Sequence, residues 1–369
     1  MDETRLIWLG LSMTPKPGPR RLKQLIRAFS GDVATLWHSS VAQLRDAGLD
    51  ERSANEFAAF RSKVRLEEHA RQLESVGARL VAADEDEYPE SLARLDDSPP
   101  ALFLRGALIA DDSLAIAIVG TRKASAYGRD VAGHFARQLA ERGVTIVSGL
   151  AHGVDAAAHR GALDAGGRTL AVLGSGINVI YPYDHRGLAG DIASQGAVLT
   201  EFPLGTPPDR FNFPRRNRII SALSLGVLVV EASEKSGALI TAELAAEQGK
   251  DVFAVPGNIF SDASSGVNRL IQDGAKPVMS VDDILNELEV SVQVTEARRT
   301  AETISPDDPV EAEILNAIGN DSAHVDDLAR TTGLPIQALL STLMLMELKG
   351  LVTSAGPMLF RRAPATGRR

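Results

Sequence analysis

The chain has no cysteine among its 369 residues, which excludes disulfide bonds, thiol nucleophiles and thiolate metal sites. It also lacks an excess of positive charge, because its formal net charge is −9. Proteins that coat nucleic acids with a wholly basic surface are therefore excluded, and any contact with a polyanion must come from a local patch.

Long apolar runs are missing as well. No stretch approaches the roughly 20 consecutive apolar residues that span a bilayer. The first residues are acidic and lack the basic segment and long apolar centre of a secretion signal. We expect a cytoplasmic protein with no membrane partner. The hydrophobic content of 44% and the charged content of 24% are ordinary for a soluble globular protein of two or three domains.

Nucleotide-binding fingerprints are absent too. Residues 120–128 run Gly-Thr-Arg-Lys-Ala-Ser-Ala-Tyr-Gly, which does not match the Gly-x-Gly-x-x-Gly pattern of dinucleotide sites. Arg122 would project where a pyrophosphate would otherwise lie, and no Walker lysine motif occurs. We therefore predict no cofactor and no ATP hydrolysis, since an arginine at this place suits an external phosphodiester better.

Residues 1–85 show apolar positions at helical spacing and predict a small helical domain, SAM-like or helix-hairpin-helix-like. Pro17-Gly18-Pro19 interrupts this pattern, and the basic residues up to Arg27 follow the break. This arrangement resembles a helix-hairpin-helix turn that grips a phosphate; a solvated helix face is the alternative. Residues 86–113 predict an extended connector.

From residue 114 to residue 289 the pattern changes to short apolar runs that alternate with helical stretches. This alternation predicts an α/β fold, a Rossmann-like doubly wound parallel sheet covered on both faces. We count about six strands, at Ala115–Val119, Val144–Val147, Leu170–Leu173, Ala197–Leu199, Val227–Val230 and Val252–Val255.

Residues 290–308 predict a linker, residues 309–362 a winged-helix domain of three helices and a hairpin, and residues 363–369 a basic tail. The third of these helices carries a single basic residue, Lys349. A helix that reads a DNA groove usually needs more positive charge. We therefore favour a protein contact or a structural role for this domain.

A basic cluster at residues 209–218, Asp-Arg-Phe-Asn-Phe-Pro-Arg-Arg-Asn-Arg, precedes a predicted helix. Arginines hold phosphates and aromatic faces stack on unpaired bases, so the cluster predicts a site for single-stranded nucleic acid. Helical residues diverge by about 100° each, so only one or two of Arg215, Arg216 and Arg218 should face a crevice. Phe211 could pack in the core, and Asn217 could brace the loop backbone.

The ends of several predicted strands are rich in glycine. Glycine lets backbone amides approach an anion, and helix N-termini add favourable partial charge. Because strand ends of a doubly wound sheet face one crevice, these loops together predict a pocket for phosphate.

Five ordered segments resemble the signature segments of the DNA-processing protein A (DprA/Smf) family: Gly120–Arg122, Ser148–Asp155, Phe213–Ser221, Ser236–Ala242 and Val252–Gly257. The resemblance covers about residues 115–280. It implies a non-catalytic protein that binds and protects single-stranded DNA, forms a homodimer through the Rossmann-like domain and loads RecA recombinase during natural transformation. The helical front and the winged-helix tail also fit the family.

The resemblance implies that Arg122 clamps a phosphate and that Phe213 stacks on a base. Arg210 stands where the family often has a lysine and should keep the phosphate contact. The predicted DNA-binding residues are Gly120, Thr121, Arg122, Ser125, Ser148, Gly149, His152, Gly174, Arg210, Phe213, Arg216, Asn217, Arg218 and Gly237.

Three other hypotheses stay open. His152, Asp155 and His159 suggest a metal or acid–base site, since positions 155 and 159 share a helix face. No further ligand has suitable spacing, so we predict no metal and consider a hydrogen-bonded helix start instead. Ser236–Glu243 is distantly similar to a motif of nucleoside-monophosphate phosphoribohydrolases, with Glu243 as the catalytic residue. A protein-interaction scaffold with a vestigial pocket is the third hypothesis.

Overall fold

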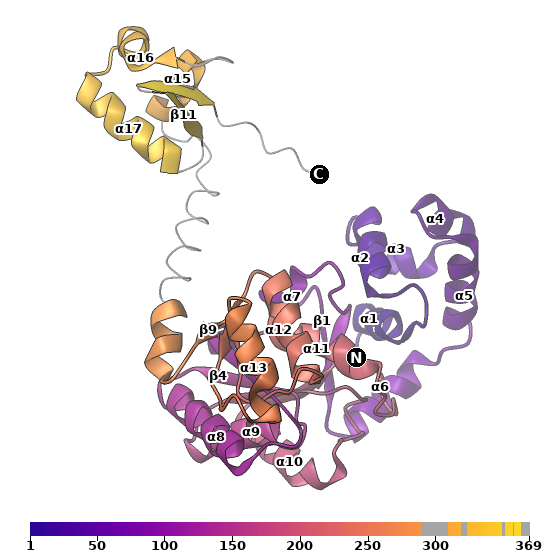
Figure 1. The fold of residues 1–369 in the computed structure, drawn as a ribbon. Coiled ribbons are helices and arrows are strands. Elements are labelled where there is room, and N and C mark those ends of the chain that lie inside the picture. The colour runs from indigo at the N-terminus through magenta and orange to yellow at the C-terminus, as the bar shows by residue number, and fades with distance from the viewer. Residues whose placement is uncertain (289–308, 319–322, 349–350, 357, 363–369) are drawn as a thin grey trace. The chain divides into compact units, whose positions relative to one another are not determined.

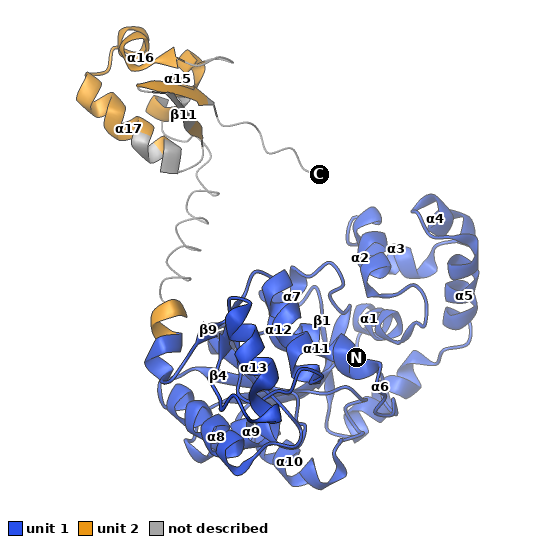
Figure 2. Cartoon of the chain, in the orientation of Figure 1, with its two compact units in different colours: residues 1–284 blue, residues 285–369 orange. Residues whose placement is uncertain are grey.

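The computed structural model describes residues 1–288, 309–318, 323–348, 351–356 and 358–362. The chain forms two compact units, residues 1–284 and residues 285–369, which Figure 2 shows in different colours. No helix in the described ranges is long and apolar enough to cross a membrane. Residues 290–308, Lys349 and the tail at 363–369 lie outside the described residues, so the linker and tail predictions are not examined further.

The first unit begins with helices that polar side chains cap. Asp2, Asp32, Ser40 and Asp50 each accept a hydrogen bond from a backbone amide three residues further on, which satisfies one free donor of a helix start. Pro19 stands at the first position of its helix, where no amide donor is needed. The helices are α1 (Glu3–Met13), α2 (Pro19–Ala28), α3 (Val33–His38), α4 (Val41–Asp46), α5 (Glu51–Arg61) and α6 (Leu66–Ser75).

The prediction of a connector at residues 86–113 is wrong, and so is the prediction that residues 1–85 are helical throughout. The structure places β1 (Arg79–Ala82) before this segment and α7 (Glu90–Ala93), β2 (Ala101–Gly106) and the short 3-10 helix η1 (Ala110–Ser113) within it. β2 pairs antiparallel with both β1 and β6 (Ala197–Thr200).

β2 is buried on both faces, as the strands between residues 115 and 229 are, but no long helical stretch stands beside it in the sequence to mark it as part of the same alternation. Phe103 packs into the core on one side of the sheet, and Leu102 and Leu104 pack into the core on the other. A strand of this kind is apolar at every position and does not alternate. The run Leu-Phe-Leu at 102–104 therefore lacks the period of two that would have indicated a strand.

Within the described residues, the main sheet has nine strands in the order β1-β2-β6-β5-β4-β3-β7-β8-β9. The fold class is confirmed, and each of the six predicted strands is present. Strands β3 to β9 pair in parallel, and β2 alone runs in the opposite direction, since it is antiparallel to both of its neighbours, β1 and β6. The bounds are β3 (Ala115–Val119), β4 (Thr145–Ser148), β5 (Thr169–Val172), β6 (Ala197–Thr200), β7 (Gly226–Val229), β8 (Asp251–Ala254) and β9 (Lys276–Pro277).

Helices cover both faces of this sheet (Figure 1). One core combines the N-terminal helices with α9 and α10, and the other combines α7 with α11, α12 and α13. The N-terminal helices therefore share a core with the sheet. The bounds are α8 (Ala126–Glu141), α9 (Val154–Asp164), η2 (Tyr183–His185), α10 (Arg186–Gln195), α11 (Asn212–Ala222), α12 (Gly237–Glu247) and α13 (Asp262–Gln272).

The order of the parallel strands reverses at β3, which lies between β4 and β7. Ligands of open α/β sheets bind outside the carboxyl ends of the strands at such a point. The loops that follow β3, β4 and β5 therefore hold the candidate site.

The second unit contains the winged-helix elements that the sequence predicts. A three-stranded sheet in the order β10-β12-β11 packs with the helices around Ile314, Val325, Leu339 and Leu343. The bounds are α15 (Pro309–Ile318), β10 (Ala323–His324), α16 (Val325–Thr332), α17 (Ile336–Leu348), β11 (Val352–Gly356) and β12 (Leu359–Arg362).

Candidate nucleic-acid interface

Arg122 and Phe213 lie together, although 91 residues separate them in the chain. The Arg122 guanidinium lies over the Phe213 ring, 4.7 Å from its centroid. Arg122 is exposed in the loop after β3, and Phe213 is half-buried in the first turn of α11. Among the described residues, Arg122 has no hydrogen-bond or ion-pair partner, so its donors are available to a ligand.

Tyr181 extends this aromatic surface. Its ring centroid lies 6.1 Å from that of Phe213 and its side chain is exposed. Sequence analysis missed this residue because no motif marks it; the only signal is its place in the loop that follows β5. We call the surface formed by Arg122, Phe213 and Tyr181 the rim, because all three side chains border the same small cavity.

A small cavity of about 30 Å³ lies at this rim. Its volume is close to that of one water molecule, which favours a nucleobase stacked at its edge over one held inside it. The lining residues are Arg122, Gly149, Ala151, His152, Tyr181, Pro182, Phe213 and Arg216.

Gly149 and Gly174 serve a different purpose from the one the sequence indicates. A Cβ atom on Gly149 would lie 2.5 Å from Nη2 of Arg216, and one on Gly174 would lie 2.7 Å from Cδ1 of Phe213. These glycines therefore make room for side chains of α11, where we had expected amides aimed at an anion. They position Phe213 at the rim.

Arg210 lies in the turn before α11, with its guanidinium 4.7 Å from the ring centroid of Phe211. Phe211 is 67% exposed, so the alternative that it packs in the core is wrong. The structure thus presents a second exposed arginine–aromatic pair three residues before Phe213. Arg210 has no ion pair among the described residues.

Arg216 is 4% exposed, and its Nη1 donates to the carbonyls of Gly149, at 2.7 Å, and Val172. Burial lowers the pKa of Arg216 to about 10, and Asp155 opposes that shift. Asn217 is also buried and accepts a hydrogen bond from Nε of Arg216 at 3.1 Å. Arg216 therefore ties α11 to the loops after β4 and β5, and Asn217 braces it.

Arg218 is 6% exposed and does not face the rim of the cavity. Its Nη2 lies 2.6 Å from Oε2 of Glu201, and its Nε lies 3.0 Å from Oδ2 of Asp97. Burial raises the pKa of Glu201, and the charge of Arg218 opposes this rise. A phosphate would have to displace both carboxylates, so we interpret Arg218 as structural.

The N-terminus of α8 is neutralised from within the protein. Oε1 of Glu231 accepts a hydrogen bond from the Ser125 hydroxyl at 2.6 Å, and Oε2 accepts one from the Ser125 amide at 2.9 Å. The amide of Thr121 donates to the carbonyl of Glu231 at 2.7 Å. The carboxylate thus takes the anion position at this helix start, and Gly120 and Thr121 serve to place Arg122.

The remaining predicted residues lie apart from the rim. Ser148 is buried, and its hydroxyl donates to the Ile118 carbonyl at 2.6 Å. Gly237 is exposed at the start of α12, where its carbonyl accepts a 3.5 Å hydrogen bond from Asn217. Glu243, from the hydrolase hypothesis, is exposed on α12.

The suggested metal trio of His152, Asp155 and His159 does not form a site. His152 is exposed at the cavity, whereas His159 is fully buried and its Nδ1 bonds to the Thr169 hydroxyl at 2.7 Å. Burial lowers the pKa of His159 to about 3. Asp155 is buried and accepts hydrogen bonds from the amides of Gly149 and Ala151. This agrees with the alternative to a metal site, a hydrogen-bonded helix start.

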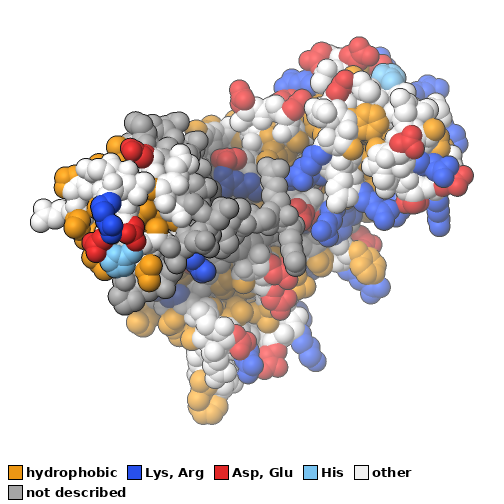
Figure 3. Space-filling view, turned by 90° about the horizontal axis from the view of Figure 1, so that it is seen from above, with side chains coloured by type: hydrophobic (Ala, Val, Ile, Leu, Met, Phe, Trp, Pro, Cys, Tyr) orange, Lys and Arg blue, Asp and Glu red, His pale blue; other side chains and the backbone are white. Residues whose placement is uncertain are grey.

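The basic run of α2 is also bound within the protein. Arg21 forms a 2.8 Å ion pair with Asp50, and Arg20 lies 3.6 Å from Asp96. The Lys23 ammonium donates to the carbonyls of Ala93, at 2.6 Å, and Leu95. Figure 3 shows acidic and basic side chains mixed on the visible face of this helical region. These contacts favour a solvated helix face over a phosphate grip.

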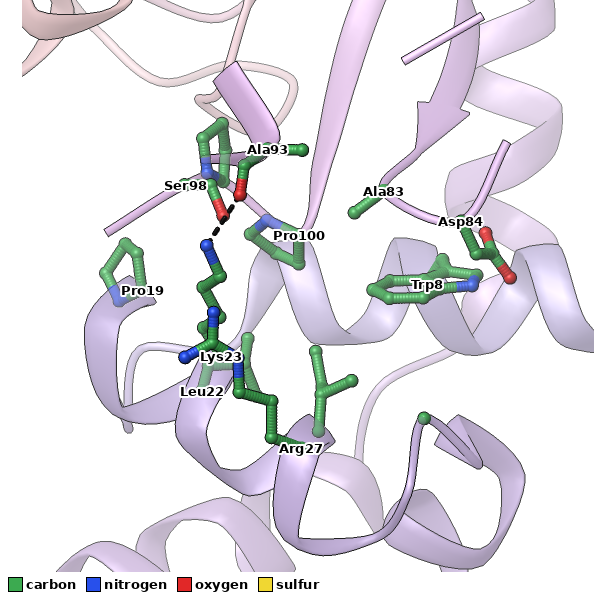
Figure 4. A pocket seen from close by; sticks show the side chains of 13 residues that line it. Trp8, Pro19, Leu22, Lys23, Arg27, Ala83, Asp84, Ala93, Ser98 and Pro100 are labelled. Carbon is green, nitrogen blue, oxygen red and sulfur yellow. Dashed lines mark hydrogen bonds between the residues drawn. The ribbon is translucent and has the colours of Figure 1, made fainter. Parts of the chain in front are cut away.

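A larger cavity of about 220 Å³ lies beside α2 and shares no lining residue with the rim. Trp8, Leu22 and Pro100 are among its lining residues, and Lys23 spans it toward the Ala93 carbonyl (Figure 4). Its walls are mostly apolar. Its position gives it no part in the arrangement around Arg122 and Phe213.

The family model of DNA recombination-mediator protein A matches residues 79–289, and that of the DprA winged helix domain matches residues 298–356. Protein Smf of Escherichia coli is 41% identical over 338 residues, which cover 90% of each chain. The first match begins at β1, so it includes β1, β2 and β9, the three strands of the main sheet that sequence analysis missed.

Two solved structures are similar. DNA processing protein A from Streptococcus pneumoniae aligns with a TM-score of 0.68 and 36% identity, over 78% of this chain and 99% of that one. DNA processing protein A from Helicobacter pylori, whose structure was described for its single-stranded DNA binding mode, aligns with a TM-score of 0.52 and 30% identity, over 58% of this chain and 96% of that one.

Proposed function

Because this chain belongs to the DprA/Smf family of DNA recombination-mediator proteins, we propose that it binds single-stranded DNA at the rim formed by Arg122, Phe213 and Tyr181. The bound strand is protected there and passed to RecA recombinase during natural transformation or DNA recombination. The protein acts by binding and not by catalysis.

The observation that carries this proposal is the contact between Arg122 and Phe213. It joins an exposed guanidinium, which has no ionic partner in the part of the chain that the structure describes, to an aromatic ring at the switch point of the sheet. A phosphate can bond to the fork of Arg122 while the neighbouring base stacks on Phe213 or Tyr181. The Helicobacter pylori relative, described for binding single-stranded DNA, supports the ligand class.

The proposed DNA contacts are fewer than the sequence predicts. We retain Arg122, Arg210, Phe213 and His152, which are exposed or line the cavity, and we add Tyr181. Gly149, Gly174, Arg216 and Asn217 position them. A flexible single strand fits such a rim better than a duplex, because the bases of a duplex are already stacked on one another.

The test measures the affinity of the full chain for a fluorescent oligonucleotide by anisotropy. We expect Phe213→Ala to weaken binding about 5- to 150-fold, since a stacked base contributes ~1–3 kcal/mol. Phe29→Ala, which removes another partly buried phenylalanine, is the matched control and should leave affinity unchanged. Equal affinity of Phe213→Ala and the parent, or equal affinity for duplex and single strand, contradicts the proposed site.

The proposed homodimer is supported by apolar side chains at one edge of the sheet. Ile259, Phe260 and Met279 are 81%, 90% and 87% exposed. They follow the carboxyl ends of β8 and β9, which are neighbouring parallel strands. Exposed apolar groups that lie close together are typical of protein interfaces.

Sedimentation of the parent and of Phe260→Glu tests this dimer. We expect the charged variant to shift the molecule toward monomer, and Tyr127→Glu, at another exposed aromatic residue, to leave the mass unchanged. A parent that sediments as a monomer at micromolar concentration contradicts the dimer. Delivery to RecA is tested separately, by whether the protein accelerates RecA filament formation on a coated strand.

A further inference from the structure

Three side chains at the edge of the rim form a cluster that sequence analysis did not find. His152, Asp184 and His185 each place one potential metal-ligand atom within 4.8 Å of the other two. His152 comes from the loop after β4, and the other two come from η2, more than 30 residues later. Because no motif spacing joins these segments, only the tertiary structure reveals the cluster.

His185 is buried, and its Nδ1 lies 2.8 Å from the carbonyl oxygen of Leu150. A carbonyl only accepts, so Nδ1 carries a proton, and in the neutral ring Nε2 then has the free lone pair. Metal-ligating histidines are usually held in this way, because a backbone carbonyl on one nitrogen fixes the tautomer and orients the other. The carbonyl belongs to the same loop that supplies His152.

His152 and Asp184 complete the cluster from the solvent side. Nε2 of His152 lies 3.6 Å from Oδ1 of Asp184, and both side chains are more than half exposed. The rings of His152 and His185 are 4.7 Å apart and meet edge to face. Exposed side chains can rotate, and a shift of about 1.5 Å brings the donors to the ~3.3 Å separation of a tetrahedral zinc site.

We propose that His152, Asp184 and His185 bind a divalent transition-metal ion, with zinc as the best match. Two imidazoles and one carboxylate suit zinc and its neighbours, whereas magnesium and calcium prefer oxygen ligands. Three protein ligands leave at least one coordination position for water or an external ligand. His152 also lines the cavity beside Arg122, so that position lies near the rim.

Through its open coordination position the metal would also bind a phosphate of the DNA. This DNA-binding role of the metal rests on the proposed function. The metal and Arg122 would be two cations at the edge of one cavity, and a phosphate bound to both would relieve their repulsion. By linkage, DNA must then raise the affinity for metal by the same factor by which metal raises the affinity for DNA. Metal binding in the absence of DNA is independent of this role.

The experiment titrates zinc into full-length protein freed of metal with EDTA, followed by calorimetry, and repeats the titration with cobalt, followed by its visible absorption. We expect one ion per chain. Asp184→Asn should weaken binding by at least about 10- to 100-fold, the loss that removal of even an outer partner of a metal site produces. His185→Ala should do the same, with Asp184→Asn as the safer variant because its side chain is exposed.

Asp191→Asn on α10 and His134→Ala on α8, both exposed, are matched controls and should bind zinc as the parent does. Equal zinc affinity of the parent and Asp184→Asn means that the ion binds elsewhere and overturns the proposal, as does the absence of zinc binding.

A second arm measures affinity for single-stranded DNA with zinc and with EDTA. Zinc should strengthen binding by the parent but not by Asp184→Asn, and in EDTA the two should bind equally. If zinc binds at this cluster and DNA does not bind at all, the proposed function fails and the metal site stands. If DNA binds and zinc does not, only the metal site fails.

Discussion

The basic side chains of α2 lie at the protein surface, whereas those of α11 are mostly enclosed. Arg21 on α2 pairs with Asp50 in contact with water. On α11, Arg218 pairs with Glu201 where both side chains are less than a tenth exposed. Water screens the first pair and leaves it a small contribution to stability. The second pair holds two charges that would be unfavourable if either were left alone.

This comparison teaches that the density of positive charge along the chain does not measure the charge available to a ligand. In both helices, most of the arginines contact carboxylates or carbonyls of the same protein. Of the arginines predicted to bind DNA, those without an ionic partner among the described residues, and exposed, are Arg122 in a loop and Arg210 in a turn. The loop and the turn let these two side chains project, whereas α11 holds Arg216 and Arg218 inside the protein.

The largest effect should come from the buried ion pair. We expect Arg218→Ala to lower the free energy of unfolding by about 3–5 kcal/mol, because Glu201 is left as a buried charge. Arg21→Ala on α2 should change it by less than about 1 kcal/mol. Urea denaturation of both variants measures the difference. Similar losses of unfolding free energy in the two variants would contradict the distinction between an enclosed ion pair on α11 and a solvent-exposed one on α2.

A second prediction extends the comparison to histidines, of which His159 is buried on α9 and His134 is exposed on α8. The folded-state pKa of His159, about 3, lies below its unfolded value. The neutral ring therefore stabilises the fold above pH ~6.5, and this stabilisation is lost as the pH falls from there toward 3, since only the unfolded chain then gains the proton.

Between pH 7.5 and pH 5, the parent should lose about 2 kcal/mol more of its free energy of unfolding than His159→Asn. Urea denaturation at each pH measures this slope, which does not depend on any uniform destabilisation by the substitution. His134→Asn should retain the slope of the parent. Parallel pH profiles for the parent and His159→Asn would show that His159 is not held neutral.

The smallest expected effect is on the salt dependence of the affinity for single-stranded DNA. Arg122→Ala should reduce the slope of log affinity for single-stranded DNA against log salt concentration by about 0.7, the value for one phosphate contact on a single strand. Arg27→Ala, which removes an exposed arginine of α2, should leave the slope unchanged. Anisotropy titrations at several salt concentrations measure both. A reduced slope for Arg27→Ala instead would place the main contact on α2.

Much of the fold could be predicted from the sequence, because its local patterns have strong periods. Short apolar runs between helical stretches predict the strands β3 to β8. Apolar residues at helical spacing predict the helices of the winged-helix domain in the same way. β1, β2 and β9 were missed: the helical elements beside β1 and β2, α7 and η1, have only four residues each, too few to show a helical period, and β9 has only two residues. β2 also packs into cores on both sides and therefore shows no period of two.

The candidate site was predicted only in part. Motif resemblance indicated Arg122 and Phe213, which the structure brings into contact. It did not indicate that Glu231 neutralises the start of α8 or that Arg218 is held by Glu201 and Asp97. Those partners lie 17 to 121 residues away in the chain, and a sequence carries no local trace of such pairs.

The amino-acid order alone determined the fold class, the family and the presence of arginines and aromatic residues near the ends of the strands, because periodicity and motifs are local properties. The tertiary structure decided which of these side chains are free. An arginine that faces solvent can donate hydrogen bonds to a ligand, whereas one that contacts a buried carboxylate stabilises the fold. Which of the two occurs depends on how distant segments of the chain pack. The same packing joined His152 to Asp184 and His185, for which no spacing rule exists.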